Sequence, residues 1–518
     1  MRTLGRRPGG RGPKVLVAAP PAGKFVASDA SGSGDGTFGS PWTLAQAAAV
    51  STGAQPGDTV WMRNGTYTLN AILNIACDGT SGSRITFRSY PGEWAKIKGS
   101  NENTFSPVTN MLIDVVGDYV NLVDLEFYHD WVSRLQPTWT PDGGFGGVDA
   151  HGPGFQIRNC VLHDLGAVAI GHWVQAQTGE IYGCLILDNG HHANDTPHGL
   201  GTYCQNQTPY TRSMKHNISM HNFIEGVSSK TAAGYVDNFT IEENIFGPNV
   251  AHYDGHLGTA SGGSVLIYDI TNVMNGNSMI GNVCWNVDDG NYFNGGPAFQ
   301  HYYGDTGFAS FTFNNNWCAG DGTTAIFSTA EDVSGTLTVN GNTMWLFNIP
   351  GGSRLLIEEA PDGTPGIRAY DNNDYYWSNA SVFYGWRLRI AEVATDYTIN
   401  AAGWTDYRAV AGEATSTFTA GAAVKPPDQT WLFANARETG RANIAVVNAT
   451  ALASTVNVNC DSVLSTGQSW WLYNASNPFN GAIASGTYTS GAGINVPMTV
   501  AVAGPSATPI GTGITVAP

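Results

Sequence analysis

The sequence predicts an all-β protein in which a long solenoid of stacked short strands is followed by a small antiparallel β-sandwich. A phrase returns along the chain: an apolar residue, two spacers, a slot residue, a spacer and a second apolar residue, as in Ile157–Leu162 and Ile241–Phe246. The slot is filled in turn by Leu125, Cys160, Cys184, Asn217, Asn244, Asn282, Asn316 and Asn342, which lie 24 to 38 residues apart. A repeat of this length indicates stacked structural units, and alternation of apolar and polar residues within each phrase is typical of strands.

The composition agrees with a strand-rich chain. The 518 residues include 65 glycines and only 13% charged residues, which suits short strands joined by tight turns. A hydrophobic content of 42% excludes global disorder, and the chain has no run of about 18 apolar residues that would predict a membrane span. The net charge of -17 argues against a nucleic-acid partner, because such proteins present a basic face to the phosphates.

Residues 1–24 are expected to form a flexible basic tail. They carry six basic residues and no acid, and their one apolar stretch, Val15–Ala19, is too short for a secretion signal. Such a segment buries too little surface to offset its ordering entropy. Two interpretations stay open: an anchor that docks on an acidic partner such as a virion or another particle, or an export signal of an unrecognised kind.

The elements that follow are predicted in order along the chain. A helical patch from Trp42 to Val50 would cap the open end of the solenoid, which is predicted to span residues 25–395. A connector with a helical patch near Trp404–Ala411 occupies residues 396–428, and the short alternating strands of residues 429–518 form the β-sandwich. The longest insertions are 129–153, 188–211 and 247–275. Insertions in a solenoid gather on one face and commonly build its binding site.

The slot positions make two further predictions. The asparagines Asn217, Asn244, Asn282, Asn316 and Asn342 are expected to stack along one edge, with their side chains bonding backbone groups of successive turns. The seven cysteines form no CxxC pair, and four of them occupy the slot or lie two residues after it. Those four are predicted to be small buried thiols, with a disulfide between neighbouring coils as the alternative, so cysteine usage does not indicate a redox compartment.

Four phrases carry a resemblance to a known family. Residues 56–68 (PGDTVWMRNGTYT), 84–100 (RITFRSYPGEWAKIKGS), 198–207 (HGLGTYCQNQ) and 403–418 (GWTDYRAVAGEATSTF) resemble right-handed parallel β-helix proteins of the pectate-lyase-like superfamily. The resemblance covers residues 25–518, and the chain is similar to members that end in a small β-sandwich. It implies a polysaccharide partner and an extracellular or virion-associated location, and it is compatible with a homotrimer. The superfamily holds lyases, hydrolases, epimerases and binding proteins, so the fold alone does not imply one activity.

Histidines gather in the part of the chain that carries the insertions. Ten of the twelve fall between His151 and His256, and Arg212, Lys215 and Lys230 lie in the same window. Titratable groups concentrated on these coils indicate a functional cleft. The alternative is that histidine serves there only as a turn and surface residue.

Residues 190–206 (GHHANDTPHGLGTYCQN) are the sharpest candidate for a catalytic segment. Asp195, His198, Tyr203 and Gln205 offer acid, base and hydrogen-bonding groups close together in sequence. The structural alternative is that the segment is a turn leading into a strand, with Tyr203 packed in the core.

β-Elimination would need a base, an acid and a positive group near the substrate carboxylate. His198 or Lys230 is the expected base, and Tyr203 is the expected acid towards the leaving oxygen. Lys215 or Arg212 is the expected clamp for the carboxylate. Trp173 and Tyr253 are expected to stack on sugar rings.

Hydrolysis would instead need two carboxylates across a groove. The candidates are Asp254, Asp288, Asp289, Glu358 and Glu359. His252, Asp254 and His256 would share one face of an extended strand, but in a glycine-rich loop such residues are more often solvated surface. No cofactor is expected, although calcium is compatible with the sequence. The sequence therefore predicts a polysaccharide-directed protein that cleaves by elimination or hydrolysis, with a non-catalytic tailspike, capsid fibre or surface protein as the alternative.

Overall fold

The protein is described by a computed structural model. It describes residues 20–100, 111–130, 135–136, 146–193, 196–231, 235–249, 264–269, 274–286, 299–301, 308–320, 327–329, 333–347, 356–359, 367–378, 384–390, 393–421, 424–449 and 454–499. The predicted tail of residues 1–24 falls mostly outside these ranges and stays a prediction.

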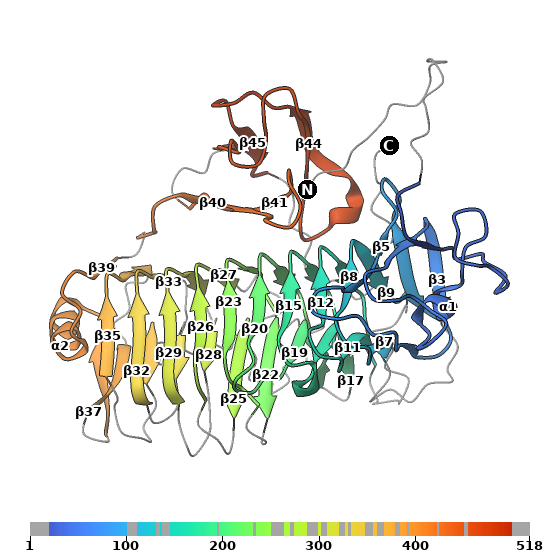
Figure 1. Ribbon diagram of the computed structural model, residues 1–518. Helices are drawn as coiled ribbons and strands as arrows, with labels where there is room; N and C mark the ends of the chain where they lie inside the picture. The colour runs from blue at the N-terminus through green and yellow to red at the C-terminus, as the bar shows by residue number, and fades with distance from the viewer. Residues whose placement is uncertain are drawn as a thin grey trace.

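Three long sheets of mainly parallel strands run along the solenoid, and most coils contribute one strand to each sheet (Figure 1). Sheet 1 contains β1 (Lys24–Val26), β2 (Thr59–Met62), β5 (Ile85–Ser89), β8 (Val120–Val123), β12 (Gln156–Arg158), β15 (Gly179–Tyr182), β20 (Arg212–Lys215), β23 (Phe239–Glu242), β26 (Asn277–Ile280), β29 (Phe308–Asn314), β32 (Val333–Asn340) and β35 (Ile367–Asp371). Sheet 2 contains β3 (Gly65–Leu69), β6 (Ala95–Gly99), β9 (Leu125–Tyr128), β13 (Val161–His163), β16 (Leu185–Leu187), β21 (Ile218–Met220), β24 (Ile245–Phe246), β27 (Val283–Asn286), β30 (Trp317–Gly320), β33 (Thr343–Phe347), β36 (Asp374–Ser378) and β39 (Thr417–Ala420).

Sheet 3 completes each coil. It contains β4 (Leu73–Ile75), β7 (Met111–Val115), β11 (Gly146–Ala150), β14 (Ile170–His172), β19 (Thr202–Cys204), β22 (Val227–Thr231), β25 (Val265–Asp269), β28 (Phe299–His301), β31 (Phe327–Thr329), β34 (Ile357–Glu359), β37 (Tyr384–Ile390) and β38 (Val393–Thr398). The last pair, β37 and β38, is antiparallel. A smaller sheet joins β10 (Leu135–Gln136), β17 (His191–Ala193) and β18 (Thr196–His198) beside the solenoid.

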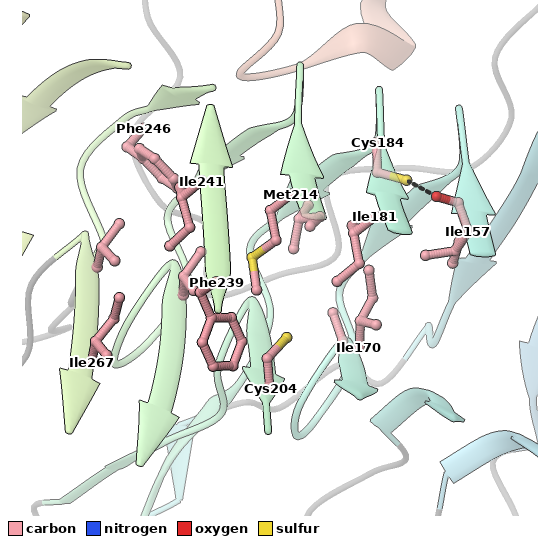
Figure 2. Close-up of a cluster of buried hydrophobic side chains, with 14 of the residues drawn as sticks. Ile157, Ile170, Ile181, Cys184, Cys204, Met214, Phe239, Ile241, Phe246 and Ile267 are labelled. Atoms are coloured by element: carbon pink, nitrogen blue, oxygen red, sulfur yellow. Dashed lines mark hydrogen bonds between the residues drawn. The ribbon is translucent and has the colours of Figure 1, made fainter. Parts of the chain in front are cut away.

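The core is a stack of inward-pointing apolar side chains. Ile157, Ile181, Met214 and Ile241 are aligned in register on neighbouring strands of sheet 1, and all four are buried (Figure 2). All seven cysteines are buried and unpaired, including the four for which buried thiols were expected. Because each apolar rung covers the next, the predicted repeat and the observed coil are the same unit.

The predicted asparagine ladder is confirmed at the turn between sheets 1 and 2. The Oδ1 atom of Asn282 accepts bonds from the backbone N–H and the Nδ2 of Asn244, each at 3.0 Å, and its own Nδ2 donates to Ile241 O at 2.9 Å. The same pattern joins Asn217, Asn244, Asn282, Asn316, Asn342 and Asn373 in sequence. A second ladder, which was not predicted, links Asn189, Asn222 and Asn249 where the chain leaves sheet 2.

Helices close both ends of the solenoid. Helix α1 (Leu44–Ala48) begins at a capping box made by Thr43 and Gln46, and its buried residues join the core. Helix α2 (Ala401–Ala411) begins at the N-cap Asn400 and ends at Gly412, whose φ of 82° suits glycine. Since β39 follows α2 and pairs with β36, residues up to Ala420 belong to the solenoid, and the part of the predicted connector from 396 to 420 is its final coil.

The C-terminal part is antiparallel, as predicted, and it lies over sheet 2 (Figure 1). It is built from the pairs β40 (Gln429–Ala434) with β41 (Ala442–Val447), β42 (Thr455–Val458) with β45 (Ile494–Pro497), and β43 (Ser469–Tyr473) with β44 (Ala482–Thr487). Single 3-10 turns occur at η1 (Val174–Ala176) and η2 (Pro478–Asn480). In the described part of the chain, no helix has both the length and the apolar character needed to cross a membrane.

Candidate functional site

The long insertions share one corner of the solenoid. The three longest connections of residues 111–269, namely 129–145, 188–201 and 247–264, each join a strand of sheet 2 to a strand of sheet 3. The corresponding connections of the intervening coils, 164–169 and 221–226, are short. The insertions therefore border sheet 3, which makes its outer face the place to look for a site.

Strand register places polar side chains in rows on that face. Asp114, Asp149, Gly171, Tyr203 and Ser228 are aligned across β7, β11, β14, β19 and β22. Residues two apart lie on the same face of an extended chain, so His151, Trp173 and Gln205 form the next row, one residue beyond the ends of β11, β14 and β19. Adjacent coils lie about 4.8 Å apart, which brings residues distant in sequence into contact.

The described side chains of these rows form a continuous strip. His151 Nδ1 lies 2.8 Å from Asp114 Oδ1, and the imidazole is parallel to the Trp173 ring with centroids 6.0 Å apart. The Trp173 and Tyr203 rings are in tilted contact at 5.2 Å, and Gln205 Nε2 donates to the Tyr203 hydroxyl at 3.3 Å. We call Asp114, Asp149, His151, Trp173, Tyr203 and Gln205 the sheet 3 strip.

Asp149 lies across the neighbouring strand because Gly171 has no side chain. A Cβ placed on Gly171 would lie 1.9 Å from Asp149 Oδ1 and 3.2 Å from Trp173 Nε1. The carboxylate thus fills the gap that glycine leaves in the row, between Asp114 and Tyr203. Burial raises the pKa of Asp149, while Trp173 and His151 partly oppose that effect.

The other titratable groups of the strip are also perturbed. The hydrogen bond to Asp114 is the largest influence on His151 and raises the pKa of its imidazole. Burial raises the pKa of Tyr203, and the bond from Gln205 opposes it. A phenol that stays protonated, a favoured imidazolium and a carboxyl that holds its proton more tightly are groups suited to proton transfer and anion binding.

The structure brings together three of the predicted site residues: Trp173, Tyr203 and Gln205. Lys230 lies on the strand next to that of Tyr203, two residues after Ser228, the partner of Tyr203. His198 ends β18, in the three-stranded sheet beside the solenoid. Of the His198 and Lys230 side chains nothing is described, so their predicted roles stay predictions.

Several predicted residues lie outside the described ranges. They are Asp195, Tyr253, the possible metal ligands His252, Asp254 and His256, and the carboxylates Asp288 and Asp289. Glu358 and Glu359 lie on β34, where only the backbone is described. Within the described side chains, no group of three or more His, Cys, Asp or Glu residues is placed to hold a metal ion.

The expected substrate-binding roles of Arg212 and Lys215 are corrected. Arg212 is fully buried inside the solenoid, where its Nη2 donates to the backbone oxygens of Trp173 at 3.1 Å and Gln205 at 2.8 Å. Burial lowers its pKa to about 9. Lys215 faces outward on sheet 1 and pairs with Glu242. Neither side chain reaches the outer face of sheet 3, although Arg212 holds the backbone of two residues that do.

Sequence reasoning missed Asp114 and Asp149. Each sits between two buried apolar residues, in Ile113–Val115 and Val148–Ala150. An acid that interrupts an apolar strand faces away from the core. This pattern could have identified both residues as part of the outer face. Their alignment could not be predicted, since the register between β7 and β11 depends on packing over the whole stack.

An apolar hollow lies between sheet 2 and the C-terminal part. It has a volume of about 340 Å³, and its walls are largely apolar, with Leu185, Ile218, Trp470 and Leu472 among them. The described lining contains no Asp, Glu, His, Lys or Arg. It therefore lacks the carboxylate, imidazole and ammonium groups that most often perform acid–base chemistry.

Comparison with known proteins agrees with the fold. Residues 24–195 match a family model described as Pel9A-like, right handed beta helix region, which confirms the predicted resemblance and its handedness. The matched region includes Asp114, Asp149, His151 and Trp173. None of the curated proteins matches the chain significantly.

Solved structures that match the chain include two polysaccharide lyases and a phage tailspike domain. Pectate lyase Pel9A is 13% identical, with 68% of this chain and 80% of that chain covered and a TM-score of 0.35. An alginate lyase from Paenibacillus sp. str. FPU-7 is 18% identical, with 60% and 94% covered and a TM-score of 0.39. The enzymatically active domain of bacteriophage CBA120 tailspike protein 2 is 9% identical, with 73% and 51% covered and a TM-score of 0.36.

Proposed function

We propose that this chain, which carries a Pel9A-like right-handed β-helix region, cleaves an acidic polysaccharide by β-elimination at the sheet 3 strip. One observation carries the proposal: His151, Trp173 and Tyr203 come from three successive coils and form one contiguous outer surface. Flat rings flanked by hydrogen-bonding groups suit the faces and edges of sugars. The substrate class is supported by the family model, since Pel9A is a pectate lyase.

The elimination assigns a role to each neighbouring group. A base removes the proton next to the uronate carboxylate, the electron pair forms the new C4–C5 double bond, and the C4–O bond breaks. Tyr203, kept protonated by burial, would give its proton to the departing glycosidic oxygen. Lys230, on the adjacent strand, is the proposed base. His198 is the second candidate for the base, and its strand belongs to a different sheet.

Hydrolysis is the second candidate, and Asp149 and Asp114 favour it. They occupy adjacent rungs in register, and their environments differ. Burial raises the pKa of Asp149, which suits a general acid. Asp114, in contrast, pairs with His151, and its Oδ1 lies 2.8 Å from the imidazole Nδ1. Two carboxyl groups in different environments can divide the acid and nucleophile roles.

A panel of acidic and neutral polysaccharides tests both reactions. Elimination produces an unsaturated end that absorbs ultraviolet light, whereas hydrolysis produces reducing ends without that absorbance. We expect unsaturated products from wild type and a rate at least about a hundredfold lower in Tyr203→Phe. The matched control is Tyr376→Phe, on sheet 2, which should retain the wild-type rate.

Each other result has a defined meaning. Reducing ends without unsaturation, lost in Asp149→Asn, would replace elimination with hydrolysis. Binding without any product would contradict cleavage and favour the non-catalytic tailspike, capsid fibre or surface protein. The proposed place of action is outside the producing cell or on a virion, where residues 1–24 would be the docking segment and a homotrimer the proposed assembly.

A further inference from the structure

We propose that His151 is the residue that selects an acidic polysaccharide, by donating a hydrogen bond from its imidazolium to a uronate carboxylate. The inference rests on the proposed function for the location of the substrate. It assigns to His151 the carboxylate-binding role that the buried Arg212 and the distant Lys215 cannot fill.

The imidazole is fixed on two sides. Asp114 from β7 binds its Nδ1 at 2.8 Å, and the Trp173 ring lies parallel to it with an interplanar angle of 2°. The side chain remains 36% exposed. With Nδ1 engaged, Nε2 is the nitrogen that can donate to a ligand on the outer face.

The groups around His151 decide its charge. Asp114 on β7 and Asp149 on its own strand are acidic and favour the imidazolium, whereas partial burial opposes it. The imidazole faces the ring of Trp173, which directly follows β14. Tyr203 and Gln205 lie on and directly after β19, and Lys230 lies on β22. His172 on β14 points inward and is fully buried. Asp114 and Asp149 therefore favour the protonated ring, whose N–H would donate a hydrogen bond to the substrate carboxylate.

This arrangement differs from a basic patch in its pH dependence. Because Asp114 and the imidazolium form a pair without net charge, and an ionised Asp149 adds a negative charge nearby, the attraction depends on a short directed bond. The preference for an acidic polymer should be present at low pH and disappear as pH rises through the pKa of His151. A lysine or arginine patch would keep its preference over that range.

The test measures binding of polygalacturonate and of its fully methyl-esterified, neutral form by affinity electrophoresis over the pH range in which histidine titrates. We expect wild type to prefer the acidic form at low pH and His151→Gln to bind it about tenfold more weakly, with little change for the ester. His151→Lys should restore the preference and remove its pH dependence. The control is His216→Gln, which removes a similar histidine–carboxylate pair, with Glu243, at the corner of sheets 1 and 2.

The results test the role of His151 separately from the proposed cleavage. Preferential binding with these variant effects but no product would support the role of His151 and overturn cleavage. Product formation with equal use of both polymers, or an acid preference that is unchanged in folded His151→Gln, would overturn the role of His151. Absence of binding to both polymers by wild type at every pH would also overturn it. Thermal melting of each variant verifies that it is folded.

Discussion

At the scale of single residues, the site depends on a glycine, which has no side chain. Gly171 leaves a gap in the row on sheet 3, and Asp149 fills it from the neighbouring strand. A Cβ on the same residue would also lie 3.2 Å from Trp173 Nε1. A glycine inside a strand often marks such a close approach.

Gly171→Ala is predicted to displace the Asp149 carboxylate. The new Cβ would lie 1.9 Å from Asp149 Oδ1, and the carboxylate would have to rotate away. In the hydrolysis candidate, where Asp149 is the general acid, we expect polysaccharide cleavage to fall about a hundredfold, since a displacement of about 1 Å can have that effect, with only a small change in melting temperature. The control is Gly82→Ala, where the added Cβ meets nothing within 4 Å. Unchanged initial rates in Gly171→Ala would show that the Asp149 position is irrelevant to cleavage.

Arg212 shows how burial changes the role of a charged residue. Its guanidinium lies inside the coil and donates to the backbone oxygens of Trp173 and Gln205. A buried cation is tolerated when its donors find partners. Here carbonyl groups accept from Nη2, and Nη1 contacts His172 Nε2. Arg212 is therefore a positioning residue beneath the strip rather than a contact for the substrate.

At the scale of elements, the asparagine ladder fixes the turn between sheets 1 and 2. The turn needs a left-handed residue before the slot, such as Gly281 with φ 67° or Asn315 with φ 56°. The slot asparagine then pairs with the backbone of the preceding coil, and its side chain is buried. Each rung thus satisfies polar groups that water cannot reach.

Asn282→Ala is predicted to destabilise the solenoid. The substitution leaves the backbone N–H of Asn244 and the backbone oxygen of Ile241 without these bonds, and each unpaired buried group costs about 1–3 kcal/mol. We expect the free energy of unfolding to fall by about 3 kcal/mol in urea titrations. Asn74→Ala, at an exposed position on β4, should leave it nearly unchanged. Equal stability of the two variants would show that the ladder adds nothing to the fold.

At the scale of the whole molecule, the C-terminal part covers sheet 2 and contacts the corner of sheets 1 and 2. Asn435 Nδ2 donates to Asn159 Oδ1 at 2.8 Å, and Arg437 Nη2 lies 2.7 Å from Glu180 Oε1. Apolar residues of both parts, including Trp317 and Phe433, form one cluster. These contacts lie on sheets 1 and 2, and the strip that carries the proposed site is on sheet 3.

A buried histidine lies beneath this interface. His163 is fully buried, with Nδ1 2.8 Å from Asp164 Oδ2 and Nε2 3.4 Å from Glu126 Oε1. The Phe479 ring of the C-terminal part contacts it at 4.5 Å. Burial lowers its pKa, but the two carboxylates outweigh burial and raise the pKa of His163 to about 9.

Stability is predicted to fall at alkaline pH because of His163. A raised folded-state pKa stabilises the protein fully below the unfolded value of 6.5, and this contribution is lost as pH rises through about 9. The contribution is on the order of 3 kcal/mol. Urea unfolding at a series of pH values should show the loss in wild type and a smaller loss in His163→Gln. Parallel pH profiles for the two proteins would contradict the assignment.

The sequence by itself determined the coil. Spacing of the slot residues predicts stacked strands, a buried asparagine edge and unpaired cysteines, because these depend on local alternation and on contact between neighbouring copies of one repeat. Trp173, Tyr203 and Gln205 could be proposed as site residues because they lie on or beside the coils that carry the insertions.

Only the tertiary structure decided which groups meet. Asp114 and Asp149 lie 35 residues apart across a long insertion, and strand register alone aligns them. Arg212 looked like a substrate clamp in a cluster of basic residues, yet strand alternation turns it inward. Lys215 lies on the same strand, β20, which belongs to sheet 1 and not to sheet 3. A shift of one residue moves a side chain from the surface to the core, and register follows from packing over the whole stack rather than from any local pattern.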